Sequence, residues 1–156
     1  MSSNRIHLRP AAQSGFTLIE VLISILVFSF GILGLVGLQA SAIRFSTDAQ
    51  QRAEATFLAD QLLARMLISD PATAATFAHK PGGATVCAPT GTASTNAIVT
   101  EWLSEVAAAF PLATSDQQQI VVSGSPANEV TVKLCWQNGA NGTQHTFEMS
   151  NRVQWQ

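Results

Sequence analysis

The first long apolar segment runs from Phe16 to Leu38, and Glu20 is its only strongly polar side chain. At about 1.5 Å per residue, a helix over this segment is roughly 34 Å long, which is enough to cross a bilayer. A carboxylate in such a segment costs free energy, of order a few kcal/mol near the membrane centre. The pattern therefore predicts a membrane-spanning helix in which Glu20 later meets a positive partner.

Beyond this segment the pattern becomes amphipathic. Between Gln39 and Ser69 there is no Pro or Gly, and apolar residues return with the 3.6-residue period of a helix. Asp70-Pro71 ends the pattern, because the residue before a proline is pushed out of helical geometry. We expect one helix from about Phe16 to Ile68, apolar all round in its first half and amphipathic in its second.

The rest of the chain predicts a connection, a short helix and a small sheet. Pro71 to Thr95 is rich in Ala, Thr, Pro and Gly, with its clearest turn at Pro81-Gly82-Gly83. A second helix is expected from about Asn96 to Phe110, with Trp102 as a core aromatic. Apolar and polar residues then alternate in three segments, as in half-buried strands: 120–122, 130–136 and 147–155.

An antiparallel sheet with one apolar face needs a cover, and the amphipathic half of the long helix can supply it. The expected fold class is therefore α+β. A long N-terminal α-helix packs on a small antiparallel β-sheet of about three or four strands.

The segment before the apolar run is basic, since Arg5, His7 and Arg9 precede Gly15 without any acidic residue. By the positive-inside tendency it stays in the cytoplasm, and the rest of the chain lies on the other side of the membrane. An ordinary cleaved signal, with a small-x-small site at residues 40–42, and an uncleaved anchor are the alternatives. The apolar run is longer than the ~7–15 residues of a signal-peptide core, which counts against the first.

The two cysteines, Cys87 and Cys135, favour a disulfide in an exported domain, with two free thiols as the alternative. Cys135 lies on the strand face opposite Val132 and Trp136. A bond to Cys87 would therefore lay the long connection over the outer face of the sheet. Closing a loop of this length stabilises the fold by roughly 4 kcal/mol in the chain-entropy treatment.

Composition argues against several classes of function. Without residues 1–15 the chain has six basic and ten acidic side chains, a formal charge of −4, and no cluster of Lys and Arg. This argues against binding nucleic acid through phosphate neutralisation. No catalytic, metal-binding or phosphate-binding motif is present, and the histidines are isolated. We expect no enzymatic activity, cofactor, metal or small-molecule substrate.

The residues 15–22, Gly-Phe-Thr-Leu-Ile-Glu-Val-Leu, resemble the processing and assembly signature of type IV pilins and type II secretion pseudopilins. The resemblance implies that a prepilin peptidase cleaves after Gly15 and that the new terminal residue, Phe16, is N-methylated. It also implies that Glu20 recruits the subunit into a filament by pairing with the terminal amine of a neighbour.

The continuation from Ile25 to Gln39 is most similar to the minor pilins called type IV pilus modification protein PilV. Within it, Gly31, Gly34 and Gly37 recur every three residues. Small residues let helices approach closely in lipid, although glycine is also simply common in membrane helices. The spacing of these three glycines alone does not decide between helix packing and the general frequency of glycine in membrane helices.

These observations predict a cleaved leader (1–15), a transmembrane and filament-core helix segment (16–38), an amphipathic helix half (39–70) and a globular α+β pilin head (71–156). The resemblance implies a minor pilin, a structural subunit of a type IV pilus involved in assembly, twitching motility or adhesion. Its partners would be other major and minor pilins, through the N-terminal helix, and the prepilin peptidase/N-methyltransferase.

The same resemblance implies a bacterial inner-membrane protein with a single span, a cytoplasmic N-terminus and a periplasmic head, which later joins a pilus on the cell surface. Three alternatives remain. They are a type II secretion pseudopilin, a membrane-anchored periplasmic binding module, and an exported soluble domain that begins at Ile43.

Overall fold

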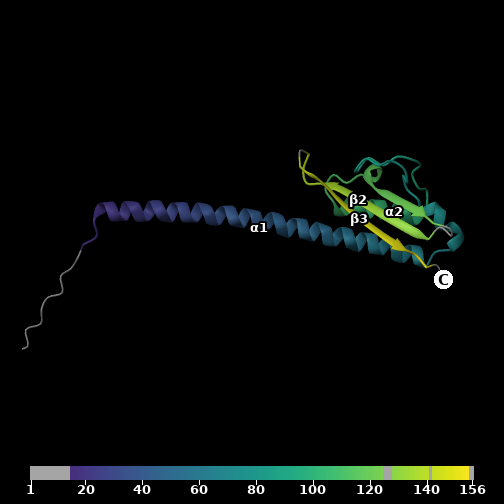
Figure 1. Cartoon of the computed structure of the whole chain (residues 1–156), viewed down its shortest axis with the longest axis horizontal. Coiled ribbons are helices and arrows are strands. Elements are labelled where there is room, and N and C mark those ends of the chain that lie inside the picture. The colour runs from purple at the N-terminus through teal and green to yellow at the C-terminus, as the bar shows by residue number, and fades with distance from the viewer. Residues whose placement is uncertain (1–14, 125–127, 141, 155–156) are drawn as a thin grey trace, which may run out of the picture. The chain divides into compact units, whose positions relative to one another are not determined.

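The computed structural model of the protein describes residues 15–124, 128–140 and 142–154 (Figure 1). Its longest element is helix α1, Leu18–Leu67, which contains 50 residues. The chain divides into two compact units after Phe45, so α1 contributes its first part to one unit and its second part to the other. Each unit is described by itself.

In the first unit, α1 is an apolar helix whose side chains are all exposed. Its most apolar 18-residue window has a mean hydropathy of 2.7 and is 0% buried, so the helix is long and apolar enough to cross a membrane. None of the residues of this unit that the structure describes, 15–45, covers these side chains. The predicted membrane-capable helix is therefore present.

The second unit, from Ser46 onward and here called the head, has an α+β fold with a three-stranded antiparallel sheet in the order β1-β2-β3. This confirms the predicted fold class. The elements that follow α1 are the 3₁₀-helix η1 (Pro71–Phe77), α2 (Ala97–Ala109), the 3₁₀-helix η2 (Ser115–Gln117), β1 (Gln119–Ser123), β2 (Glu129–Gln137) and β3 (Gln144–Arg152).

The sheet has an apolar inner face and a polar outer face, because successive strand residues point to opposite sides. Val132 of β2 lies between Ile120 of β1 and Met149 of β3 on the inner face. On the outer face, Lys133 is paired with Glu148, and their side chains form a 3.3 Å ion pair. The alternation predicted from the sequence for these strands is therefore observed.

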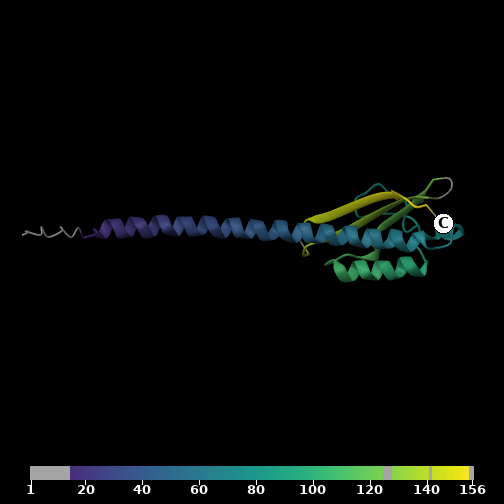
Figure 2. The ribbon, with the colours of Figure 1, turned by 90° about the horizontal axis from the view of Figure 1, so that it is seen from below.

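Both helices of the head pack on the inner face. The core combines six α1 residues with residues of α2 and the sheet, and its largest fully buried side chains are Trp102 and Trp136. The second half of α1 covers the sheet as expected, and α2 runs alongside it (Figure 2). The core members from the helices are Ala55, Leu58, Ala59, Leu62, Leu63, Met66, Val99, Trp102, Leu103 and Val106.

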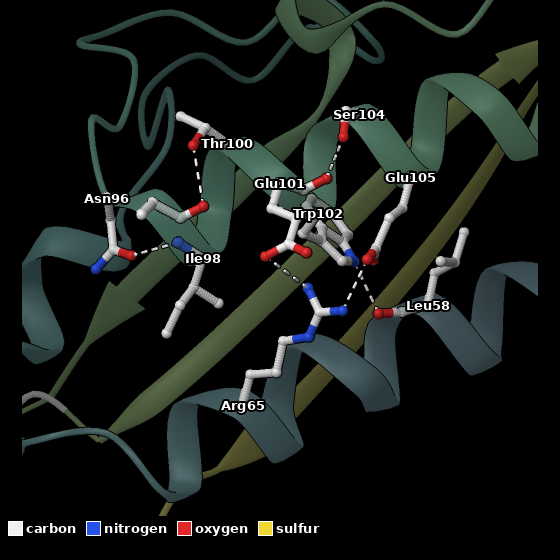
Figure 3. A network of polar contacts seen from close by, with 10 residues as sticks. Leu58, Arg65, Asn96, Ile98, Thr100, Glu101, Trp102, Ser104 and Glu105 are labelled. Atoms are coloured by element: carbon white, nitrogen blue, oxygen red, sulfur yellow. Dashed lines mark hydrogen bonds and ion pairs between the residues drawn. The ribbon is translucent and has the colours of Figure 1, made fainter.

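Polar contacts fix α2 against α1 (Figure 3). The Trp102 Nε1–H donates to the Leu58 carbonyl at 2.8 Å. Arg65 lies 2.7 Å from Glu105 and 4.0 Å from Glu101. The side chains of Arg65 and Glu105 are only 25% and 29% exposed, so the nearer pair is partly shielded from water. Trp102 is a core aromatic, as its place in the helical pattern predicts.

The structure differs from the sequence-based expectation at two places. The connection after α1 begins with η1, because the Asp70 side chain accepts a hydrogen bond from the Ala72 N–H and Pro71 supplies a helical φ. At the other end, β3 stops at Arg152. Val153 is buried outside the strand, and the predicted strand residue Trp155 lies outside the described residues.

Candidate functional site

The N-terminal segment 15–20 leads into α1. Gly15, Phe16 and Thr17 have no regular secondary structure and are exposed, and the helix begins at Leu18. The Thr17 carbonyl accepts the first bonds, from the N–H groups of Glu20 at 3.1 Å and Val21 at 3.4 Å. The Gly15–Phe16 peptide bond therefore lies outside the helix, in exposed backbone.

The four glycines of this region have no structural requirement within the chain. A Cβ added to Gly15, Gly31, Gly34 or Gly37 would meet no atom within 4 Å. Each of the three helical glycines nevertheless weakens the helix by roughly 1 kcal/mol relative to Ala.

Glu20 lies in the first turn of α1, where the positive end of the helix dipole favours a carboxylate. No described residue forms an ion pair with it. The polar hydroxyl groups that follow are satisfied within the helix, since Ser24 and Ser29 donate to the carbonyls of Glu20 and Ile25 at 2.7 Å. Glu20 is therefore an exposed carboxylate without an ion-pair partner among the described residues.

A family model described as the prokaryotic N-terminal methylation motif matches residues 10–36. The match supports a type IV pilin-like protein. It includes Gly15, Phe16, Glu20 and two of the three helical glycines, and it excludes Gly37 and the head. Comparisons with curated proteins and with solved structures gave no significant match.

A pilin-like motif indicates a structural subunit rather than an enzyme. It also implies processing by a prepilin peptidase and assembly with other pilins in general. Together with the apolar helix, it fits a protein that is anchored in a membrane before it enters a pilus.

The head contains the predicted disulfide. Cys87 and Cys135 are bonded, with Cα atoms 5.6 Å apart. Cys135 is on the outer face of β2, so the bond holds the segment 83–89 over that face. A shallow pocket lies beneath the segment and includes Lys133 and Glu148 in its lining.

Polar contacts that the sequence analysis missed hold the same connection in place. The Gln119 side-chain amide donates to the carbonyls of Lys80 at 3.0 Å and Gly82 at 2.9 Å. Lys80 Nζ lies 2.6 Å from Asp116. The hydrogen bond and positive charge of Lys80 lower the pKa of the Asp116 carboxyl. The disulfide is thus one of several attachments of this connection to the sheet.

Buried Gln118 and His79 were also not predicted as structural residues. Gln118 bonds both backbone groups of Cys135, accepting from its N–H at 2.8 Å and donating to its carbonyl at 3.0 Å, much as another strand would. His79 pairs with Ile120 through two backbone bonds of 2.9 Å. A run of three glutamines, 117–119, that leads into a strand carries no recognisable signal for the role of Gln118.

The described residues offer no group of three or more His, Cys, Asp or Glu side chains that could hold a metal ion. The two histidines in this part of the chain are separated. His145 stacks on Trp136 and lies 3.3 Å from Asp48, whereas the His79 ring contacts the backbone of Ser94 and Ser115. The chemistry that the sequence suggests therefore remains in the N-terminal segment.

Proposed function

We propose that this chain is a minor pilin, a non-enzymatic subunit of a type IV pilus that is cleaved after Gly15, N-methylated at Phe16 and recruited through Glu20. The observation that carries the proposal is the methylation motif at residues 10–36, which includes the beginning of the exposed apolar helix α1.

The surroundings of Gly15 support cleavage at this position. The residue is exposed, lies outside α1, and has free space where a Cβ would be. Folding of the chain therefore does not require glycine there, whereas a peptidase that binds the backbone closely does. Cleavage is also what creates a positive charge at Phe16, because its nitrogen is an uncharged amide until the bond is cut.

The geometry at the start of α1 supports a partner for Glu20 from another subunit. Residues four apart lie side by side only within a helix, and Phe16 precedes the first helical residue, Leu18. Pairing of the new amine with Glu20 of the same chain is therefore not favoured by this backbone. In a dry helix bundle, an amine and a carboxylate from neighbouring chains would offset the cost of burying each charge.

The exposed helical glycines fit the same assembly. Gly31, Gly34 and Gly37 leave the backbone of α1 open to the approach of another helix. We infer that the first part of α1 binds the helices of other major and minor pilins, with the inner membrane as its surroundings before assembly. The division into leader (1–15), core helix (16–38), amphipathic half (39–70) and head (71–156) belongs to this proposal.

The mature amino terminus tests the proposal. Mass spectrometry of the protein from producing cells should find N-methylphenylalanine at Phe16, and a Gly15→Leu variant should keep its leader. A terminus at Met1 would instead indicate an uncleaved anchor, and one at Ile43 an ordinary signal peptide. A type II secretion pseudopilin would share the Phe16 terminus. Deletion would then abolish enzyme secretion, whereas loss of surface fibres or twitching supports the pilus.

A further inference from the structure

The outer edge of the sheet is an open strand. β3 pairs with β2 on one side, and no described residue pairs with its other side. At the opposite edge of the sheet, β1 is covered in part by His79, which bridges to Ile120. β3 contains nine residues and no proline, and its two charged side chains are Glu148, which is paired with Lys133, and Arg152 at its end, so the backbone between them is open to a further strand.

The hydrogen-bond pattern shows which groups face the open edge. The Val153 N–H donates to the carbonyl of Asn128. These two residues lie directly opposite each other, one step beyond the last pair of the β2–β3 register. In an antiparallel pair, such directly opposite bonded residues occur at every second position. The odd-numbered residues of β3 therefore bond to β2. The even-numbered residues direct their N–H and C=O groups outward: Gln144, Thr146, Glu148, Ser150 and Arg152.

The open edge has a definite end. The Asn151 side chain accepts the Arg152 N–H at 2.8 Å, which caps the last outward amide. The outward backbone N–H and C=O groups of the even-numbered residues from Gln144 to Ser150 have no hydrogen-bond partner among the described residues. This length fits an extended segment of about seven residues.

The side chains beside the edge define the chemistry of that segment. On the inner face, Phe147 and Met149 are only partly buried although they pack against the core. On the outer face, Thr146 and Ser150 are polar, and Glu148 is already paired with Lys133. An added strand with apolar residues on the inner side and uncharged polar residues on the outer side would bury Phe147 and Met149 without leaving an unpaired charge.

A second copy of the chain does not fit this edge. If two β3 strands paired antiparallel over their whole length, Glu148 at the centre of one strand would lie directly opposite Glu148 of the other copy, and like charges directly opposite are destabilising. A parallel pair would place the apolar inner face of one sheet beside the polar outer face of the other.

We propose that β3 binds, by strand addition, an extended alternating apolar and polar segment of a different protein exported to the same compartment. The backbone of Gln144 to Ser150 supplies the binding groups, and Phe147 and Met149 supply the apolar contact. This surface belongs to the head and does not involve Glu20 or the glycines of α1.

A labelled synthetic peptide tests the proposal on the full-length chain in detergent micelles. The probe has valines alternating with threonines between terminal lysines, and binding is followed by fluorescence anisotropy. The wild-type chain should bind this peptide. The peptide is expected to add antiparallel to β3, as the other strands of the sheet pair, so its threonine amides face β3. N-methylation of the threonine amides should therefore weaken binding at least about tenfold, whereas N-methylation of the valine amides should leave it unchanged.

Matched variants test the same edge from the protein side. Thr146→Pro and Ser150→Pro remove outward N–H groups and keep the bonds to β2, so both should fold and lose the peptide at least about tenfold. Thr146→Ala and Ser150→Ala keep the amides and should bind normally. Equal binding by both methylated peptides, no binding by the wild-type chain, or crosslinking of two copies through β3 would overturn the proposal. The processing of the amino terminus is unaffected by any of these results.

Discussion

Removal of the disulfide by the double substitution Cys87→Ala/Cys135→Ala should destabilise the head by about 4 kcal/mol. The two cysteines are 48 residues apart in sequence, so the bond closes a loop of about 49 residues. In the chain-entropy treatment, opening a loop of this length restores roughly 14 cal/mol/K of freedom to the unfolded chain, or about 4 kcal/mol at 25 °C.

The folded state should change little, which is why most of this value should be observed. Gln118 still bonds the backbone of residue 135, and Gln119 still holds the carbonyls of Lys80 and Gly82. The ion pair between Lys80 and Asp116 also remains. The connection therefore keeps its place on the sheet without the bond, and the loss arises from the greater freedom of the unfolded chain.

Urea unfolding of the full-length protein in detergent micelles measures this loss. Trp102 and Trp136 are both buried in the head, so their fluorescence reports its unfolding. We expect the free energy of unfolding to fall by about 4 kcal/mol and the midpoint temperature by roughly 15 °C. Reductant should lower the stability of the wild-type protein and leave the double variant unchanged. A loss below about 1 kcal/mol, or a similar effect of reductant on both proteins, would refute the loop-closure reasoning.

Three further predictions concern other parts of the chain. Trp102→Phe removes the buried hydrogen bond to the Leu58 carbonyl and part of the core volume, so urea unfolding should show a loss of about 2–3 kcal/mol; a neutral effect would contradict the packing described. Because the pKa of Asp116 is lowered in the folded state, its ionised carboxyl stabilises the fold at pH values above its unfolded-state pKa of about 3.9. This stabilisation is lost as the pH falls through the folded-state pKa. Asp116→Asn should therefore lose less stability than wild type between about pH 5 and pH 2 at low salt, and the difference should shrink in high salt because the carboxyl is exposed; identical acid profiles would contradict the role of Lys80. Gly34 lies outside the head, and a Cβ added there would meet no atom within 4 Å, so Gly34→Leu should leave head unfolding unchanged and reduce the amount of the subunit in sheared fibres; unaltered incorporation would argue against helix packing at this position.

The architecture follows from periodicity along the sequence. The change from a 3.6-residue to a 2-residue period separates helices from strands, and the observed α1 differs from the predicted helix by only a few residues at its ends. The face assigned to Cys135 followed from its position between Leu134 and Trp136, both of which point into the core. These predictions succeed because burial of one face imposes a regular pattern on the residues.

The connection between α1 and α2 shows what periodicity cannot reveal. Its structure depends on side chains that bond to distant backbone groups, such as Gln119 with the carbonyls of Lys80 and Gly82. Such bonds depend on the completed fold and have no local pattern. The same is true of the open edge of β3, because strand order and hydrogen-bond direction are set by pairing and not by composition.

The N-terminal site was recognisable for a different reason. Glu20 lies in the first turn of an apolar helix and has no ion-pair partner among the described residues, and Gly15 just before that helix has free space where a Cβ would be. The proposed function assigns these two residues to a neighbouring subunit and to a peptidase.

The most direct measurement of the central claim is the amount of a Glu20→Ala variant in purified fibres, relative to its amount in the membrane. Ser24→Ala is the matched control, because its hydroxyl is already satisfied by the Glu20 carbonyl one turn away. The account predicts that Glu20→Ala is inserted, cleaved and folded normally but is strongly depleted from fibres, while Ser24→Ala is incorporated like wild type. Normal incorporation of Glu20→Ala would contradict the recruitment of this subunit through its carboxylate.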